Sequence, residues 1–169
     1  MKVVKILLVV VGLFIGVIAA AFIISGLLIP AERSFTNTVE INKPADKVWQ
    51  VITDKGKFPE WQTNLTKVEV VDDRHWIEYP KDSPEPLRFT LGKDTRPESM
   101  AFEYKMGDSF DGTWYGYITP TSTGVQLKTV DQYIAKGWVT KILIYMFFDL
   151  DKFAKDWNGK LKQRVEKLD

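Results

Sequence analysis

An uncharged apolar run near the N-terminus constrains this chain more than any other feature. The 24 residues from Ile6 to Ile29 carry no charge, and Ser25 has the only side-chain hydroxyl among them. A helix of about 20 apolar residues crosses the ~30 Å hydrocarbon core of a bilayer. We therefore expect residues 1–30 to form a transmembrane anchor and residues 31–169 to form one separate domain.

A cleaved signal peptide is the alternative interpretation of this run, because Ala19 to Ala21 resemble the small residues that precede a cleavage site. However, residues 22–29 continue apolar for eight more positions, where a cleaved precursor turns polar. We therefore favour an uncleaved signal-anchor. Lys2 and Lys5 precede the run. The positive-inside rule then predicts a cytoplasmic N-terminus and an extracytoplasmic domain, periplasmic or at the cell surface in a bacterium.

Small residues recur along one side of the expected anchor. Gly12, Gly16 and Ala20 are spaced by four residues, which allows two helices to approach closely. A homodimer through Gly12 and Gly16 would use this face, although small residues are common in any membrane helix.

Composition excludes several classes of function. Among 169 residues there are 23 basic and 22 acidic side chains and no cysteine. The balanced charge gives no electrostatic reason to expect nucleic acid as a partner, and the missing thiols exclude disulfides and zinc ribbons. His75 is the only histidine, and no phosphate-binding or dinucleotide-binding glycine motif occurs. We therefore predict no metal, no cofactor and no catalytic residue.

The rest of the chain reads as one α+β unit. Residues 34–41 alternate apolar and polar, as a strand with one buried face does. Pro44 begins an expected helix, and a second short helix is expected around Pro59 to Thr63. Alternation then returns, which predicts about seven antiparallel strands in a meander, counting the first. The later strands are expected at residues 65–71, 74–79, 87–91, 100–106, 112–119 and 125–133.

The chain is expected to end in a long helix whose apolar residues step by three or four along one face. A curved antiparallel sheet around this helix would leave a pocket between the two. The apolar stripe consists of Ile142, Met146, Leu150, Phe153, Trp157, Leu161, Val165 and Leu168.

The segment from Val39 to Trp49 resembles the opening of the SRPBCC superfamily, the START-like or polyketide-cyclase-like helix-grip domains. It runs from an apolar strand through Pro44-Ala45 to Val48-Trp49. Asp54, Phe58-Pro59 and Trp61 follow at matching spacing, and residues 149–166 look like the closing helix of the family. The resemblance implies a helix-grip fold around a deep apolar cavity that binds lipids, polyketides, hormones or other hydrophobic molecules. These motifs are structural, so they imply little about activity.

The expected cavity is lined by inward-facing strand residues and by the long helix. Trp49 and Trp61 are expected to pack the small helices instead. His75 is expected to be structural or solvent-facing. For Asp131 a role as acid or base requires burial, and we favour the simpler alternative that a bulge turns it outward or that it caps a turn. The lining residues are predicted as Asn37, Phe89, Leu91, Phe102, Tyr104, Tyr117, Asp131, Met146, Leu150 and Phe153.

These features favour a membrane-tethered domain that binds a lipid or another hydrophobic small molecule. A cyclase or aromatase-type enzyme is one alternative, and burial of Asn37, His75 or Asp131 with hydrogen bonds among them would favour it. An accessory protein that binds a membrane partner is the other, and a filled core without a cavity would favour it.

One part of the last helix does not fit the apolar stripe. Ile144 and Phe148 lie on the opposite side, with Trp138 and Tyr145 at its margin. Two large apolar groups on an expected wet face need cover. One possibility is that this end of the helix touches the bilayer beside the mouth of the pocket. The alternatives are that a loop covers Ile144 and Phe148, or that the helix starts later in the sequence.

Overall fold

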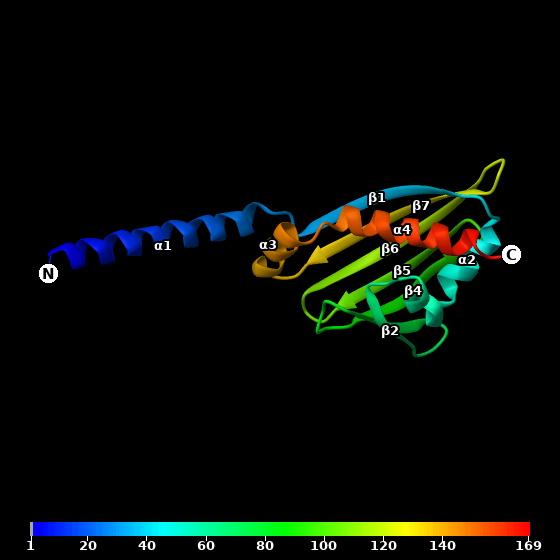
Figure 1. Cartoon of the computed structure of the whole chain (residues 1–169), viewed down its shortest axis with the longest axis horizontal. Coiled ribbons are helices and arrows are strands. Elements are labelled where there is room, and N and C mark those ends of the chain that lie inside the picture. Colours follow the sequence, from blue (N-terminus) through cyan, green and yellow to red (C-terminus); the bar gives the residue numbers. More distant parts are fainter. Residues whose placement is uncertain (1) are drawn as a thin grey trace.

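The computed structural model describes residues 2–169. Helix α1 (Lys2–Leu28) projects from one end of a curved sheet, and the C-terminus lies at the opposite end (Figure 1). Gly26 is the only buried residue of α1. The helix is long and apolar enough to cross a membrane, a test that a signal sequence also passes.

The predicted meander is confirmed, because all seven strands pair antiparallel in a single sheet with the order β1-β7-β6-β5-β4-β3-β2. The first strand pairs with the last, and β2 lies at the other edge. The strands are β1 (Glu32–Ile41), β2 (Leu65–Val70), β3 (His75–Pro80), β4 (Leu87–Thr95), β5 (Ser99–Met106), β6 (Phe110–Pro120) and β7 (Val125–Ala135).

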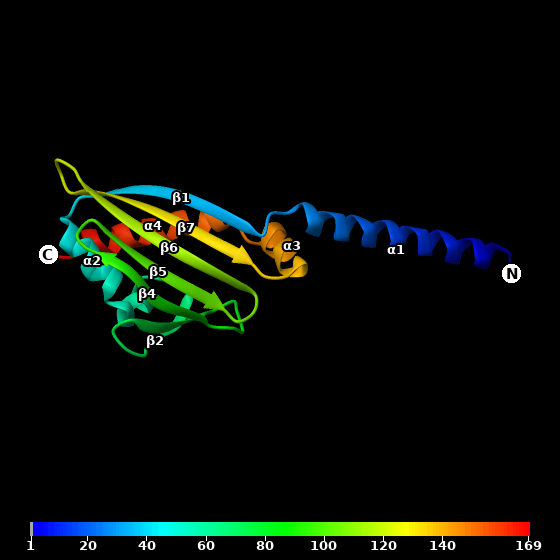
Figure 2. The same cartoon turned by 180° about the vertical axis from the view of Figure 1, so that it is seen from behind.

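Helices cover only the concave face of the sheet. Helix α2 (Ala45–Thr53), the 3₁₀ helix η1 (Lys55–Glu60) and the long helix α4 (Leu150–Glu166) pack there, whereas no helix of residues 2–169 covers the opposite face (Figure 2). This arrangement confirms the α+β helix-grip fold. The second short helix begins earlier than expected, since η1 starts at Lys55 rather than near Pro59.

The prediction of a single helix from Ile142 onward is wrong, because helix α3 (Trp138–Phe147) precedes α4 as a separate element. Phe148 is extended between them, and the Asp149 carboxylate accepts a hydrogen bond of 2.9 Å from the Lys152 amide. Such a side chain satisfies one of the free N–H groups at a helix start and so begins a new helix. The expected stripe is therefore interrupted, and Met146 is 62% exposed.

The two tryptophans expected to pack the small helices are both buried. The Trp49 indole N–H donates to the Pro97 carbonyl at 2.8 Å. The Trp61 ring lies 5.4 Å from that of Phe58 and 5.6 Å from that of Trp157, which joins η1 to α4. These contacts give both residues the structural role predicted for them.

Candidate functional site

The concave face has a covered end and a half-covered end. Beside α2 the inward side chains, such as Ile41, Met100 and Leu127, are almost completely buried. Toward α3 most of the inward side chains keep part of their surface exposed, although Tyr133 and Ala135 are buried there, so α4 and the loops do not cover this end fully. We call the partly exposed residues the half-covered end: Arg33, Phe35, Glu78, Leu87, Phe89, Leu91, Tyr104, Phe110 and Asp131.

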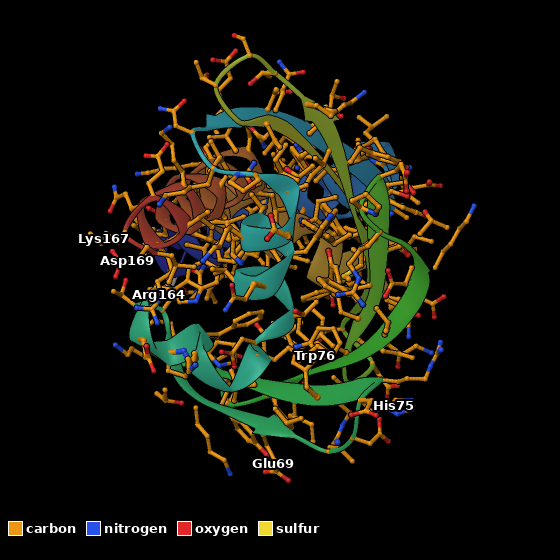
Figure 3. All side chains as sticks on the ribbon, turned by 90° about the vertical axis from the view of Figure 1, so that its right-hand side faces the viewer. Glu69, His75, Trp76, Arg164, Lys167 and Asp169 are labelled. Carbon is orange, nitrogen blue, oxygen red and sulfur yellow. The ribbon has the colours of Figure 1, made fainter. Side chains whose placement is uncertain are left out.

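Aromatic rings run in a continuous path across the concave face. The Phe102 ring stacks on Trp114 at 5.0 Å and meets Trp76 edge-on at 4.9 Å, and Trp76 stacks on Phe89 at 4.9 Å. Figure 3 shows Trp76 pointing into the space between sheet and helices while its neighbour His75 points out. These rings fill much of that space, so the enclosed cavity expected from the sequence stays a prediction.

Tyr104 and Asp131 form a part-buried pair at the half-covered end. The Tyr104 hydroxyl donates to Asp131 Oδ1 at 2.5 Å. The Tyr104 ring reaches β7 across Gly112, where a Cβ would lie 2.2 Å from the ring. Burial raises the pKa of Asp131 to about 6, although the hydrogen bond from Tyr104 lowers it. The favoured expectation that Asp131 turns outward is therefore wrong: β7 pairs without a bulge through this position.

Sequence reasoning missed a second inward carboxyl group, Glu78. The Trp76 indole N–H donates to Glu78 Oε1 at 2.9 Å, and burial raises the pKa of Glu78 to about 7. The available signal was strand parity, since a residue two positions after the buried Trp76 lies on the same face. Two carboxyl groups that are readily protonated therefore face the concave side, on β3 and β7.

Sequence reasoning also missed a cation, Arg33, at the edge of the half-covered end. Its guanidinium carbon lies 5.0 Å from the ring centre of Phe35 and 5.6 Å from that of Tyr145. Within residues 2–169, no carboxylate lies within ion-pair distance of it. Arg33 pairs in register with Tyr133, whose pKa is raised by burial while Arg33 lowers it. Among the described residues, the charge of Arg33 therefore meets aromatic rings and no carboxylate.

Asn37 marks the boundary between the two ends. It is buried opposite Thr129 in the register of β1 and β7, and the Thr129 hydroxyl accepts a 2.9 Å hydrogen bond from the Asn158 amide on α4. The Asn37 amide nitrogen has no partner within residues 2–169. Across the same residues, no three His, Asp or Glu side chains gather as metal ligands do.

Of the remaining predicted site residues, Phe89, Leu91 and Phe102 join Tyr104 on the concave face. On α4, Leu150 is half-buried and Phe153 is 39% exposed.

Two predicted residues lie elsewhere. Met146 is on α3, and Tyr117 is on the other face of the sheet, 43% exposed and stacked on Tyr115. On β6 the residues that face the concave side are Trp114 and Gly116, and Tyr117 faces the other way. His75 is exposed, as expected, and it pairs with Asp72 at 2.9 Å.

A hollow of about 260 Å³ on the other face of the sheet is lined mainly by outward polar groups such as Glu103, Lys105 and Thr113. Tyr104 and Gly112 also line this hollow, but its outward polar groups do not correspond to the expected apolar cavity.

The sequence pattern of the family described as polyketide cyclase / dehydrase and lipid transport matches residues 32–168. This chain belongs to that family. The match covers the whole sheet together with α2, η1, α3 and α4. No curated protein matches the chain by sequence.

Solved structures share the fold at low identity. A START superfamily protein from Mycobacterium smegmatis is 15% identical with a TM-score of 0.63, over 80% of this chain and 99% of that chain. The Zhui aromatase/cyclase from a Streptomyces species is 11% identical with a TM-score of 0.67, over 80% and 94%. Norcoclaurine synthase from Thalictrum flavum, in complex with dopamine and hydroxybenzaldehyde, is 13% identical with a TM-score of 0.64, over 87% and 93%.

Proposed function

We propose that this protein is a membrane-tethered domain that binds a lipid or another hydrophobic small molecule on the concave face of its sheet. The observation that carries the proposal is the half-covered end, where large apolar side chains face inward but remain partly exposed. Burying such side chains under a ligand is favourable, at about 25 cal/mol for each Å² removed from water. Membership of a family that binds hydrophobic small molecules supports the same conclusion.

The polar groups at this end suggest how a ligand would be oriented. Arg33 places a positive charge at the edge, and Tyr104 and Asp131 form a polar pair further in. Ligand sites are commonly apolar with a few polar groups that fix orientation. An amphiphile with its anionic group at Arg33 and its apolar part against Phe89 and Leu91 would satisfy both.

Uptake of a fluorescent fatty acid by residues 31–169 tests the binding function. The fragment should bind the probe at micromolar concentration, and Leu91→Trp should abolish binding because the larger ring occupies the half-covered end. Tyr117→Trp adds a ring to the other face and is the matched control that should bind normally. Cooperative thermal unfolding verifies the fold of each variant. Equal binding by Leu91→Trp and the parent fragment would place the ligand elsewhere.

Membrane tethering and orientation need a separate test. The flanking Lys2 and Lys5 support a cytoplasmic N-terminus, with α1 retained as an anchor. A reporter enzyme that works only outside the cytoplasm, fused after Asp169, should be active, and the mature protein should keep residues 1–29. An inactive reporter, or a mature N-terminus near Phe22, would contradict this topology.

A cyclase or aromatase-type enzyme is the second candidate, and the Tyr104–Asp131 pair is the observation that favours it. A carboxyl group with a pKa of about 6 can both give and accept a proton near neutral pH. Incubation with a poly-β-keto thioester, followed by mass spectrometry, would detect loss of water on ring closure. Asp131→Asn should abolish that loss while leaving probe binding intact. If the parent protein leaves the thioester unchanged, the enzyme candidate is refuted and ligand binding is the remaining proposed function.

A further inference from the structure

Helix α3 is apolar on every side. Lys141 is its only charged residue, and Thr140 the only other residue without an apolar or aromatic side chain. Phe147 is 75% exposed. A continuous apolar surface of this kind is unusual on a domain surrounded by water. The exposed apolar side chains of this region are Trp138, Val139, Leu143, Tyr145, Met146, Phe147 and Phe148.

The same helix packs against the C-terminal part of α1 (Figure 1). The Trp138 ring meets that of Phe22 edge-on at 5.4 Å. Gly26 permits the approach, because a Cβ there would lie 3.1 Å from Ile142 and 3.2 Å from Trp138. Lys141 Nζ donates to the Ile29 carbonyl at 3.3 Å, which places its charge at the end of the apolar run.

These contacts fix the depth of α3 relative to the apolar run. At ~1.5 Å per residue, the 24-residue run from Ile6 to Ile29 is about 36 Å long, roughly 6 Å more than the hydrocarbon core. Even if the whole excess lies on the domain side, Phe22 lies about 4 Å inside the hydrocarbon and Gly26 lies in the headgroup region. A helix that contacts both residues cannot stand clear of the bilayer.

We propose that α3 is an interfacial membrane helix, embedded in the leaflet next to the domain and packed on the end of α1. The proposal rests on α1 being a retained anchor. The bilayer is the occupant that fits the exposed surface, because α3 continues the apolar surface of α1 and has Trp138 and Tyr145 at headgroup depth, where such rings concentrate. Lys141 keeps its charge at the level where the apolar run ends.

This placement brings the half-covered end next to the lipid. Arg33 contacts Tyr145 of α3, and the Phe148 ring lies 5.8 Å from that of Phe153 on α4. The segment between Leu28 and Glu32 is also too short to hold the domain away, since three residues extend by only about 10 Å. An amphiphile could thus pass from the leaflet to the concave face without crossing water.

Depth-dependent fluorescence on the full chain tests the proposal. The chain has no cysteine, so Phe147→Cys and the control Tyr117→Cys each accept one environment-sensitive fluorophore. Each variant is placed in phosphatidylcholine nanodiscs at one chain per disc, with or without spin-labelled lipid. At position 147 we expect blue-shifted emission that spin-labelled lipid quenches several-fold and aqueous iodide does not. At position 117 we expect the reverse.

Three results would overturn the proposal. Iodide quenching at position 147 as strong as at 117 would show that α3 lies in water. Blue-shifted emission without quenching by spin-labelled lipid would show that protein covers α3 instead. A chain that fails to enter the discs would remove the anchor on which the proposal rests. Met146→Cys repeats the measurement if Phe147→Cys does not fold. Fatty-acid uptake by residues 31–169 is independent of all these results, so failure here and failure of the binding function are distinguishable.

Discussion

The protonation of Asp131 offers a direct test of the concave face. Asp131→Asn replaces the carboxyl group by a neutral group of the same shape, and the Tyr104 hydroxyl can still donate to the amide oxygen. In the unfolded chain an aspartate has a pKa of about 3.9, whereas burial raises the pKa of Asp131 to about 6. The folded protein therefore binds this proton more tightly than the unfolded chain.

The sign and size of the effect follow from this difference. Stability due to Asp131 is complete below about pH 4 and is lost as the pH rises through about 6, because the folded state must then hold a charge in an apolar place. A difference of about two pKa units corresponds to about 3 kcal/mol. The variant should match the parent near pH 4 and exceed it by up to about 3 kcal/mol at pH 8.

Urea unfolding of residues 31–169, followed by tryptophan fluorescence at both pH values, measures the two free energies of unfolding. Glu103→Gln is the control, because it changes an exposed carboxylate on the other face and should alter stability by about 0.5 kcal/mol or less. If Asp131→Asn shifts stability equally at pH 4 and pH 8, the carboxyl group is not preferentially protonated in the fold. The assignment of a buried acid would then be wrong.

Three further outcomes are expected. Arg33→Gln should weaken binding of a fatty-acid anion about tenfold, because a charge-assisted hydrogen bond contributes about 1.5 kcal/mol, and it should leave binding of the matching fatty alcohol unchanged. Competition against a fluorescent fatty acid measures both affinities. If the variant loses the same affinity for the anion and for the alcohol, Arg33 has no such role. Gly26→Leu should detach α3 from α1, because even a Cβ at position 26 would lie 3.1 Å from Ile142. The rate of amide hydrogen exchange in α3, measured in nanodiscs, should then rise. An unchanged exchange rate would contradict the packing of α3 on α1. Trp61→Ala should cost roughly 3–5 kcal/mol by urea unfolding, and a loss below about 1 kcal/mol would mean that the ring does not hold η1 to α4.

Most of the fold could be predicted because local patterns determine it. The alternation of residues 100–106 fixes which side of β5 is buried, and Pro44 fixes where α2 begins. The break before α4 was missed because the apolar stripe steps from Met146 to Leu150 with helical spacing, across Phe148 and Asp149. The signal for the break lay in chemistry instead of periodicity, since Asp149 is a typical helix-capping residue.

The site residues could be predicted only where apolar and polar residues alternate clearly enough to show which face of the sheet each one occupies. Phe89 and Tyr104 alternate with polar residues and lie inward as expected. Residues 114–118 are large or apolar on both faces, so Tyr117 was placed on the wrong one. The burial of Asp131 could not be read from β7 alone, because its partner Tyr104 comes from β5, two strands away across Gly112.

Within residues 2–169, hydrogen bonds and ion pairs fasten helix α4 to the rest of the domain only from its middle, at Asn158, to its C-terminal end. Lys162 Nζ donates to the Glu40 carbonyl at 2.6 Å, Glu166 accepts from the Asn42 amide at 3.0 Å, and Arg164 pairs with Glu60 at 2.5 Å. Figure 3 shows Arg164 at this end, next to the C-terminus. Within residues 2–169, no hydrogen bond or ion pair ties residues 150–157 to the sheet.

The helix is thus held by polar contacts beside α2, whereas its first two turns are held by apolar contacts alone, such as that between Phe153 and Phe148. Deflection of these two turns separates apolar contacts, which are individually weak, and leaves every strand-to-strand hydrogen bond intact. The part of the domain that moves most easily is therefore the start of α4, at the end of the concave face where a ligand would enter. The sheet and the C-terminal half of α4 keep their shape.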